Sequence, residues 1–196
     1  MLKSAEGDIE TQITIAAHHE AGHATVAAVR RILLRPEGIM VGQDAQGLAC
    51  YRKEPDRTDA SVEAHILASF AGFYAENHFR KMRGHQPRDY EILRQSLDWQ
   101  EARSIEGLLS DTYLAGRSVS TVHKALEERA EQLVAQNWPV IERVAQALLD
   151  KRWEPRKPLR SNFQWSGSGM AKYVIGEEIV EILVDSGITA DCLPGD

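Results

Sequence analysis

The feature that most constrains this chain is a segment that carries an HExxH motif. Residues 13–29 are rich in alanine and contain no proline, so we expect a helix there. Within this segment, residues 19–23 read His-Glu-Ala-Gly-His. Because residues four apart share one face of a helix, His19 and His23 can offer two imidazoles to one metal ion. Glu20 lies at the edge of that face, where a zinc hydrolase needs a carboxylate base.

A motif this short also arises by chance, so its setting decides its weight. The chain has seven histidines in 196 residues, and an accidental match is expected in roughly a few per cent of such chains. Here the polar residues lie in an apolar segment, where buried polar groups need partners. Gly22 costs a helix about 1 kcal/mol relative to alanine, which indicates that another segment packs closely against it. The motif and its setting together favour a metal site.

The composition narrows the class of protein. Hydrophobic residues make up 43% of the chain and charged residues 27%, as in ordinary globular proteins. The net charge of −6 argues against nucleic acid as a partner. No apolar run reaches about eighteen residues and the first residues do not resemble a signal peptide, so we expect no membrane partner and a cytoplasmic location. Cys50 and Cys192 are expected to be isolated thiols.

Turn signals and hydrophobic periodicity predict a mainly helical α+β protein. The motif helix is expected over residues 9–31. A small antiparallel sheet is expected after it, within residues 32–53, with turns at 36–38 and 42–47. Further helices are expected near residues 58–83, 97–105, 118–138 and 139–149. Pro139 either begins a new helix or kinks the preceding one.

The chain is expected to fold as one main domain with a C-terminal appendage. Residues 1–156 form the metal-site domain in this interpretation. Residues 157–169 include a proline and a Ser-Gly tract and are typical of a linker. Residues 170–196 are expected to be a tail with one short amphipathic helix, roughly 176–186, ended by Gly187. The small sheet either packs as a purely structural hairpin or binds an extended peptide along its edge, and the sequence favours neither.

A third metal ligand has to come from a distant segment. A hydrolytic zinc site normally has three protein ligands and a water molecule, and the motif supplies two. Glu76 and Asp98 are the main candidates, because both fall on later helices that can fold back onto the first. His65, His78 and His85 are weaker candidates. Spacing alone does not choose among these residues.

Four stretches together suggest a family. Residues 19–24 read HEAGHA, 67–76 read LASFAGFYAE, 96–102 read SLDWQEA, and 138–149 read WPVIERVAQALL. In this order they resemble the HEAGHA, AGRxAE and SNDxxxAT stretches and the late apolar helix of the peptidase domain of FtsH-type ATP-dependent zinc metalloproteases. The resemblance covers about residues 12–152. The first motif is shared by zincins at large, whereas the four stretches in order point to this family.

The resemblance implies a zincin-like helical peptidase domain with a small antiparallel sheet after the motif helix. It also implies the ligand set, because the family's third zinc ligand is the aspartate of the SNDxxxAT stretch. Zinc (Zn2+) would be held by His19, His23 and Asp98, with Glu20 as the general base, and Glu76 stays in reserve as a ligand. The implied function is a zinc-dependent metalloendopeptidase that cleaves a peptide or an unfolded protein with a metal-activated water.

The sequence also departs from the family pattern. Phe73 stands where the family has an arginine, and Leu97 replaces an asparagine beside Asp98. The family's ATP-driven unfoldase and membrane anchor are not found in this sequence, so we expect either cleavage of loose segments only or an ATPase partner that acts in trans. Assembly into a homo-oligomer stays open. The alternative functions are a catalytically inactive, zinc-stabilised interaction or regulatory protein on the same scaffold, and a metal-free helical module.

Overall fold

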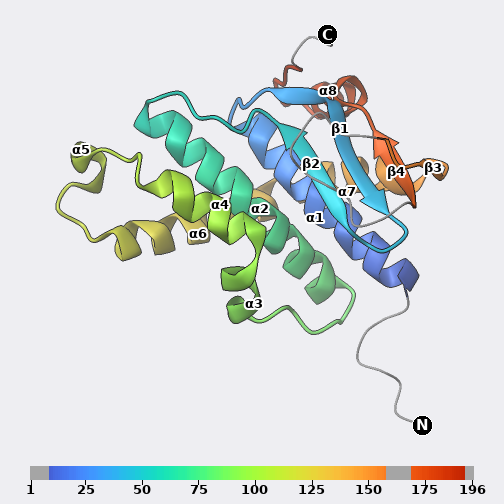
Figure 1. Cartoon of the computed structure of the whole chain (residues 1–196), viewed down its shortest axis with the longest axis horizontal. Helices are drawn as coiled ribbons and strands as arrows, with labels where there is room; N and C mark the ends of the chain where they lie inside the picture. The colour runs from blue at the N-terminus through green and yellow to red at the C-terminus, as the bar shows by residue number, and fades with distance from the viewer. Residues whose placement is uncertain (1–8, 158–168, 193–196) are drawn as a thin grey trace.

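The computed structural model describes residues 9–157 and 169–192 of the chain. They form a mainly helical α+β structure with an antiparallel sheet on one side (Figure 1). The helices are α1 (Ile9–Val29), α2 (Asp59–Met82), α3 (Tyr90–Gln95), α4 (Leu97–Glu106), α5 (Asp111–Leu114), α6 (Val119–Gln136), α7 (Trp138–Leu149) and α8 (Gly176–Asp185). The strands are β1 (Leu34–Gly42), β2 (Gly47–Tyr51), β3 (Glu154–Pro155) and β4 (Met170–Val174).

The motif helix α1 lies at the centre of the fold because it is apolar on nearly all sides. It packs against α2 and α7, and β1 and β2 cover a further side (Figure 1). Ala17, Ala21 and Val26 are completely buried. At the crossing with α2, a Cβ atom on Gly22 would lie 2.5 Å from the Cβ atom of Ala75, so only glycine fits there. The expected close packing at Gly22 is therefore confirmed.

The sheet has the strand order β2-β1-β4-β3, and all neighbouring strands are antiparallel. The turn expected at residues 36–38 is wrong, because these residues lie inside one continuous strand, β1. The pairing of β1 with β2 shifts register between Leu34 and Ile39. Gly38 has a φ of 65° there, and a Cβ atom on it would collide with the backbone of Val174. The Pro-Glu-Gly sequence forms a bulge, which tolerates the missing N–H of proline.

The C-terminal segment contributes a strand as well as the expected helix. The helix is α8, and Gly187 follows it with a φ of 80°. The strand, β4, was not expected from the sequence, and it pairs with β1 in the register Met40 to Tyr173. Ile179 and Leu183 of α8 are fully buried and belong to the main hydrophobic core. Most of the expected linker, residues 158–168, lies outside the described residues.

The remaining helices follow the sequence signals closely. Thr58 caps α2 through its side chain, and α6 begins after Ser118, whose hydroxyl accepts a hydrogen bond from the N–H of Thr121. Pro139 lies in the first turn of a new helix, α7, and does not kink α6. Leu97, the first residue of α4, is 71% exposed.

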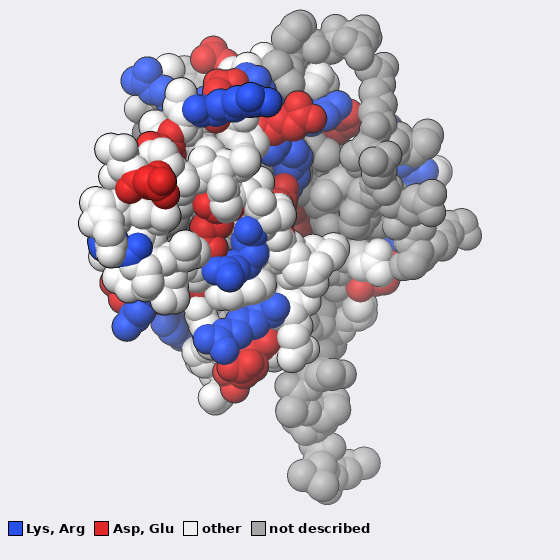
Figure 2. All heavy atoms as spheres, turned by 60° about the vertical axis from the view of Figure 1, so that its left-hand side comes forward, with Lys and Arg blue, Asp and Glu red and all other residues white. Residues whose placement is uncertain are grey.

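The cysteines, the helix compositions and the surface charges of the described residues give little indication of a function. Cys50 and Cys192 are free thiols, as expected. None of the described helices combines the length and the apolar character needed to cross a membrane. On the face shown in Figure 2, acidic and basic side chains lie close to one another.

Candidate metal centre

The three side chains expected as metal ligands meet at one point, between α1 and α4. The Nε2 atoms of His19 and His23 lie 3.0 Å apart. The Oδ2 atom of Asp98 lies 3.2 Å from Nε2 of His19, and its Oδ1 atom lies 3.4 Å from Nε2 of His23. Asp98 occupies the first turn of α4 because Ser96 caps that helix, its hydroxyl accepting from the N–H of Trp99. The helical period brings the two histidines together, and the packing of α4 adds the carboxylate.

The outer nitrogen of each imidazole is already engaged, which fixes what the inner nitrogens can do. Nδ1 of His23 lies 2.7 Å from the carbonyl oxygen of Ala68, and Nδ1 of His19 lies 3.5 Å from Oε2 of Glu76. Both oxygens accept hydrogen bonds, so in the neutral form of each imidazole Nδ1 carries the proton and Nε2 presents a lone pair. Two lone pairs and the Asp98 carboxylate then converge. This donor set fits a cation held among the three side chains.

The electrostatics of the cluster also favour a cation. Burial disfavours charge on His19, but its contacts with Asp98 and Glu76 outweigh burial and raise the pKa of His19 well above its usual range. Burial would raise the pKa of Asp98, but the imidazoles lower it well below its usual range. The pKa of Glu76 is likewise lowered, since His19 and nearby arginines outweigh the effect of burial. Negative charge therefore persists around the imidazoles at neutral pH and attracts a positive charge.

Gly72 of α2 makes room for the two imidazoles. A Cβ atom at this position would lie 2.3 Å from Nε2 of His23 and 2.6 Å from Nε2 of His19. The α2 backbone therefore passes directly against the inner nitrogens, and any larger residue would displace them. Gly72 was not expected in the site from the sequence. The signal in the sequence is a glycine inside an expected helix. Such a glycine lowers helix stability, so its presence indicates that another group packs closely against it.

Glu20 lies beside the cluster, against the first residue of β2. A Cβ atom at Gly47 would lie 2.3 Å from Oε1 of Glu20, so the carboxylate and the strand are in close contact. The Glu20 side chain is buried, and burial raises its pKa. A carboxylate with a raised pKa accepts a proton more readily than an ordinary one and can return it. The position and environment of Glu20 therefore suit a general base.

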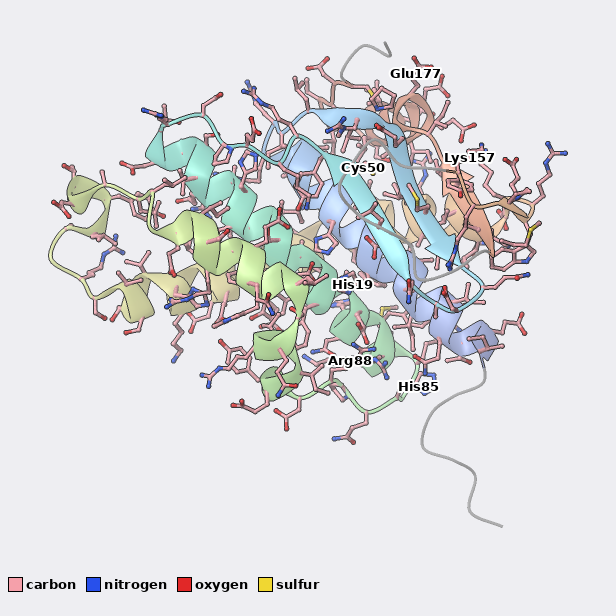
Figure 3. The ribbon with its side chains drawn as sticks, in the orientation of Figure 1. His19, Cys50, His85, Arg88, Lys157 and Glu177 are labelled. Carbon is pink, nitrogen blue, oxygen red and sulfur yellow. The ribbon has the colours of Figure 1, made fainter. Side chains whose placement is uncertain are left out.

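His19 and Glu20 line an open groove with a volume of about 860 Å³. The apolar part of its lining comes mainly from α1 and includes Ile92 of α3. Arg80 and Arg88 also form part of its wall, and they come from the end of α2 and the loop after it. Figure 3 shows Arg88 below His19, toward that loop. The groove gives the cluster access to a ligand larger than water.

The other third-ligand candidates have different roles. Glu76 contacts the outer nitrogen of His19 and lies behind the ring, outside the group of atoms that could hold a metal ion. Both ring nitrogens of His65 lie 2.8 Å from backbone carbonyl oxygens. The ring of His78 packs against Trp138, with centroids 4.3 Å apart. His85 is exposed in the loop after α2 (Figure 3). Among the described residues, the group whose ligand atoms lie close enough to hold a metal ion consists of His19, His23 and Asp98.

The chain matches no protein-family model, and no curated protein sequence matches it. The resemblance to FtsH-type peptidases therefore rests on the four sequence stretches alone and stays a prediction. The observations on which a function can be argued are the α+β fold, the convergence of two imidazoles and a carboxylate, and the buried glutamate beside them.

Proposed function

We propose that this chain is a zinc-dependent metallopeptidase whose metal is held by His19, His23 and Asp98. One observation carries the proposal: the three donor groups converge, and both imidazoles are oriented from behind by hydrogen-bond acceptors. Two imidazoles and one carboxylate are a donor set typical of zinc. Three protein ligands leave a coordination position for water or substrate, as catalytic zinc sites do and structural ones do not.

Glu20 is the residue that moves protons in this proposal. Zinc, when bound, would supply a Lewis acid that polarises a carbonyl group and makes water more acidic. Glu20 accepts the proton of the attacking water, and the hydroxyl oxygen forms a bond to the carbonyl carbon of the peptide. Glu20 then gives that proton to the amide nitrogen as the C–N bond breaks, so the products are a carboxylic acid and an amine.

The surroundings of Glu20 support a peptide as the substrate. β2 stands at an edge of the sheet, and its first residue, Gly47, touches the Glu20 carboxylate. An extended peptide can pair with such an edge through main-chain hydrogen bonds, which would bring its backbone beside the base. The arrangement of a motif helix under an edge strand supports a zincin-like fold and agrees with the four stretches that resemble FtsH-type peptidases.

Metal analysis combined with peptide digestion tests this function. Purified protein is expected to carry about one equivalent of zinc, the number that one mononuclear site holds. It is expected to cleave a mixed peptide library, to lose cleavage with 1,10-phenanthroline, and to regain it when zinc is added back. Stoichiometric zinc without any cleavage would favour the zinc-stabilised interaction protein instead. Protein that binds no zinc after incubation with the metal would contradict both functions.

A further inference from the structure

Two arginines converge on one oxygen of a single carboxylate in the wall of the groove. Nε of Arg80 lies 2.8 Å from Oε1 of Glu76, and Nε of Arg88 lies 2.6 Å from the same atom. The other oxygen of Glu76 faces His19. The single negative charge of Glu76 therefore faces the two positive charges of Arg80 and Arg88. These three side chains together carry a net positive charge.

Both guanidinium groups contact Glu76 through Nε, so their outer nitrogens are further donors for a ligand. Within residues 9–157 and 169–192, Glu76 is the ion-pair partner of both side chains, of which Arg88 is 41% exposed and Arg80 15%. Both side chains line the same groove as His19 and Glu20. Of the other two acidic residues of the groove, Asp44 is paired with Arg156, and Glu20 lies against Gly47. The cationic donors of this wall are those of the two arginines.

Arg88 lies in a loop, but its backbone is held in place. The amide side chain of Asn77, on α2, accepts a hydrogen bond from the N–H of Arg88 at 2.7 Å and donates one to its carbonyl oxygen at 3.3 Å. Asn77 itself is only 9% exposed. A residue whose backbone is anchored in this way loses less freedom when its side chain binds a ligand. The arrangement is therefore organised before any substrate arrives.

We propose that Arg80 and Arg88 bind a carboxylate group of the peptide substrate, so that the enzyme prefers acidic peptides. The inference rests on the peptidase function proposed above and adds a substrate class to it. The guanidinium fork matches the geometry of a carboxylate and forms charge-assisted hydrogen bonds with it. The carboxylate belongs either to an aspartate or glutamate side chain or to the C-terminus of the substrate.

A set of quenched fluorescent peptides distinguishes these two sources. In one series, Glu or Gln is placed in turn at each of the three positions on either side of the cleaved bond, with an amidated C-terminus. In the other series, a Gln peptide is shortened residue by residue, with either a free or an amidated C-terminus. We expect kcat/KM to favour one carboxylate-bearing peptide over its neutral partner by about tenfold, as for one charge-assisted hydrogen bond. Equal kcat/KM values in every pair would overturn the inference.

The variant Arg88→Gln tests whether the arginine causes this preference, and Arg129→Gln is its matched control. Arg129 lies 2.6 Å from Glu63, which also binds Arg30, and this site is outside the groove. The side chains of Arg88 and Arg129 are 41% and 45% exposed, so their removal disturbs similar ion pairs. We expect Arg88→Gln to bring the ratio of kcat/KM values close to one and Arg129→Gln to leave it unchanged. Loss of the ratio in both variants would show a general effect on the fold and contradict the inference.

A binding measurement separates this inference from the peptidase function. Zinc-loaded Glu20→Gln protein is titrated with the same peptides, and Kd is measured by fluorescence anisotropy. If wild-type protein cleaves nothing but the acidic peptide still binds about tenfold more tightly than its neutral partner, the peptidase function fails and carboxylate binding stands. If peptides are cleaved and bound without regard to charge, the peptidase function stands and the arginines serve only to neutralise Glu76.

Discussion

Glu76 lies behind the imidazole of His19, with its Oε2 atom 3.5 Å from Nδ1, while Nε2 on the far side of the ring faces Asp98 at 3.2 Å. This relationship assigns different roles to the two acidic residues that the sequence offered as third ligands. Asp98 belongs to the group that could hold a metal ion, and Glu76 contacts one imidazole of that group from the other side of the ring. Outer residues of this kind fix the tautomer and the direction of a metal-binding histidine.

The first prediction concerns the order of zinc affinities. Glu76→Gln is expected to weaken zinc binding by roughly 10- to 100-fold, because it loosens the orientation of His19. Asp98→Asn is expected to weaken it further, because an amide replaces a charged ligand. Competition with a chromophoric chelator gives both affinities. A larger loss in Glu76→Gln than in Asp98→Asn would instead identify Glu76 as the direct ligand.

The second prediction concerns the space beside the imidazoles. Gly72→Ala would place a methyl group 2.3 Å from Nε2 of His23, so zinc affinity should fall at least tenfold while the helical content is retained. Gly107→Ala is the matched control, because a Cβ atom there meets no other atom within 4 Å. Zinc titration and circular dichroism check both variants. Equal zinc affinity in the two variants would show that α2 does not limit the space at the ligands.

The third prediction concerns the general base. Glu20→Gln is expected to keep wild-type zinc affinity and to lower kcat by roughly 10²- to 10⁴-fold, because an amide cannot accept the proton of water. The matched control is Glu10→Gln, which changes an exposed carboxylate on the same helix. Stopped digests with zinc-loaded protein measure kcat for both variants, and a zinc titration measures their affinity for the metal. Undiminished cleavage in Glu20→Gln would show that a different residue takes the proton.

The parts of the site that the sequence predicts are those fixed by local geometry. His19, Glu20 and His23 lie on one helix, and the helical repeat alone brings them to one side. Asp98 was one of several candidates from spacing, and only the resemblance to a family singled it out. Gly72 was missed because its role depends on how α1 crosses α2, a contact between residues far apart in the chain.

The sheet also depends on contacts between residues that lie far apart in the chain. The Pro-Glu-Gly sequence at 36–38 has the chemistry of a turn, but the chain pairs with β2 on both sides of it and with the distant β4 directly after it, so it lies within a strand. β4 itself is short, and its signal in the sequence is weak because its main partner lies more than a hundred residues earlier. Arg88 joins the groove only because Asn77 holds its loop. Periodicity and turn signals do not report such long-range contacts.

The fourth prediction concerns the pH dependence of stability in zinc-free protein. The pKa of folded His19 lies above the ordinary value of about 6.5, so its contribution to stability is fully present below that pH. The contribution is lost as the pH rises through the raised pKa. Zinc binding has the opposite dependence, because the imidazoles must release protons. In EDTA, Tm should therefore fall above about pH 6.5, while the increase in Tm caused by zinc should grow.

The variant His19→Gln isolates this effect from the titration of other groups. The difference in Tm between wild-type and variant protein in EDTA should be largest below about pH 6.5 and should shrink at higher pH. Differential scanning fluorimetry across a series of buffers provides the measurement. A difference that is constant with pH, or that grows as the pH rises, would contradict the raised pKa of His19.

The last prediction concerns the C-terminal segment, which was expected to be a tail. Leu183 of α8 is completely buried in the main core, and its neighbour Val184 is 54% exposed. Leu183→Ala should therefore lower the free energy of unfolding by about 2–5 kcal/mol, whereas Val184→Ala should change it by less than about 0.5 kcal/mol. Urea unfolding monitored by circular dichroism measures both. Because β1 pairs with β4 on one side and β2 on the other, a loosened C-terminal segment should also reduce peptide cleavage in Leu183→Ala. Equal, small losses of stability in the two variants would mean that α8 does not pack on the body that holds the metal ligands.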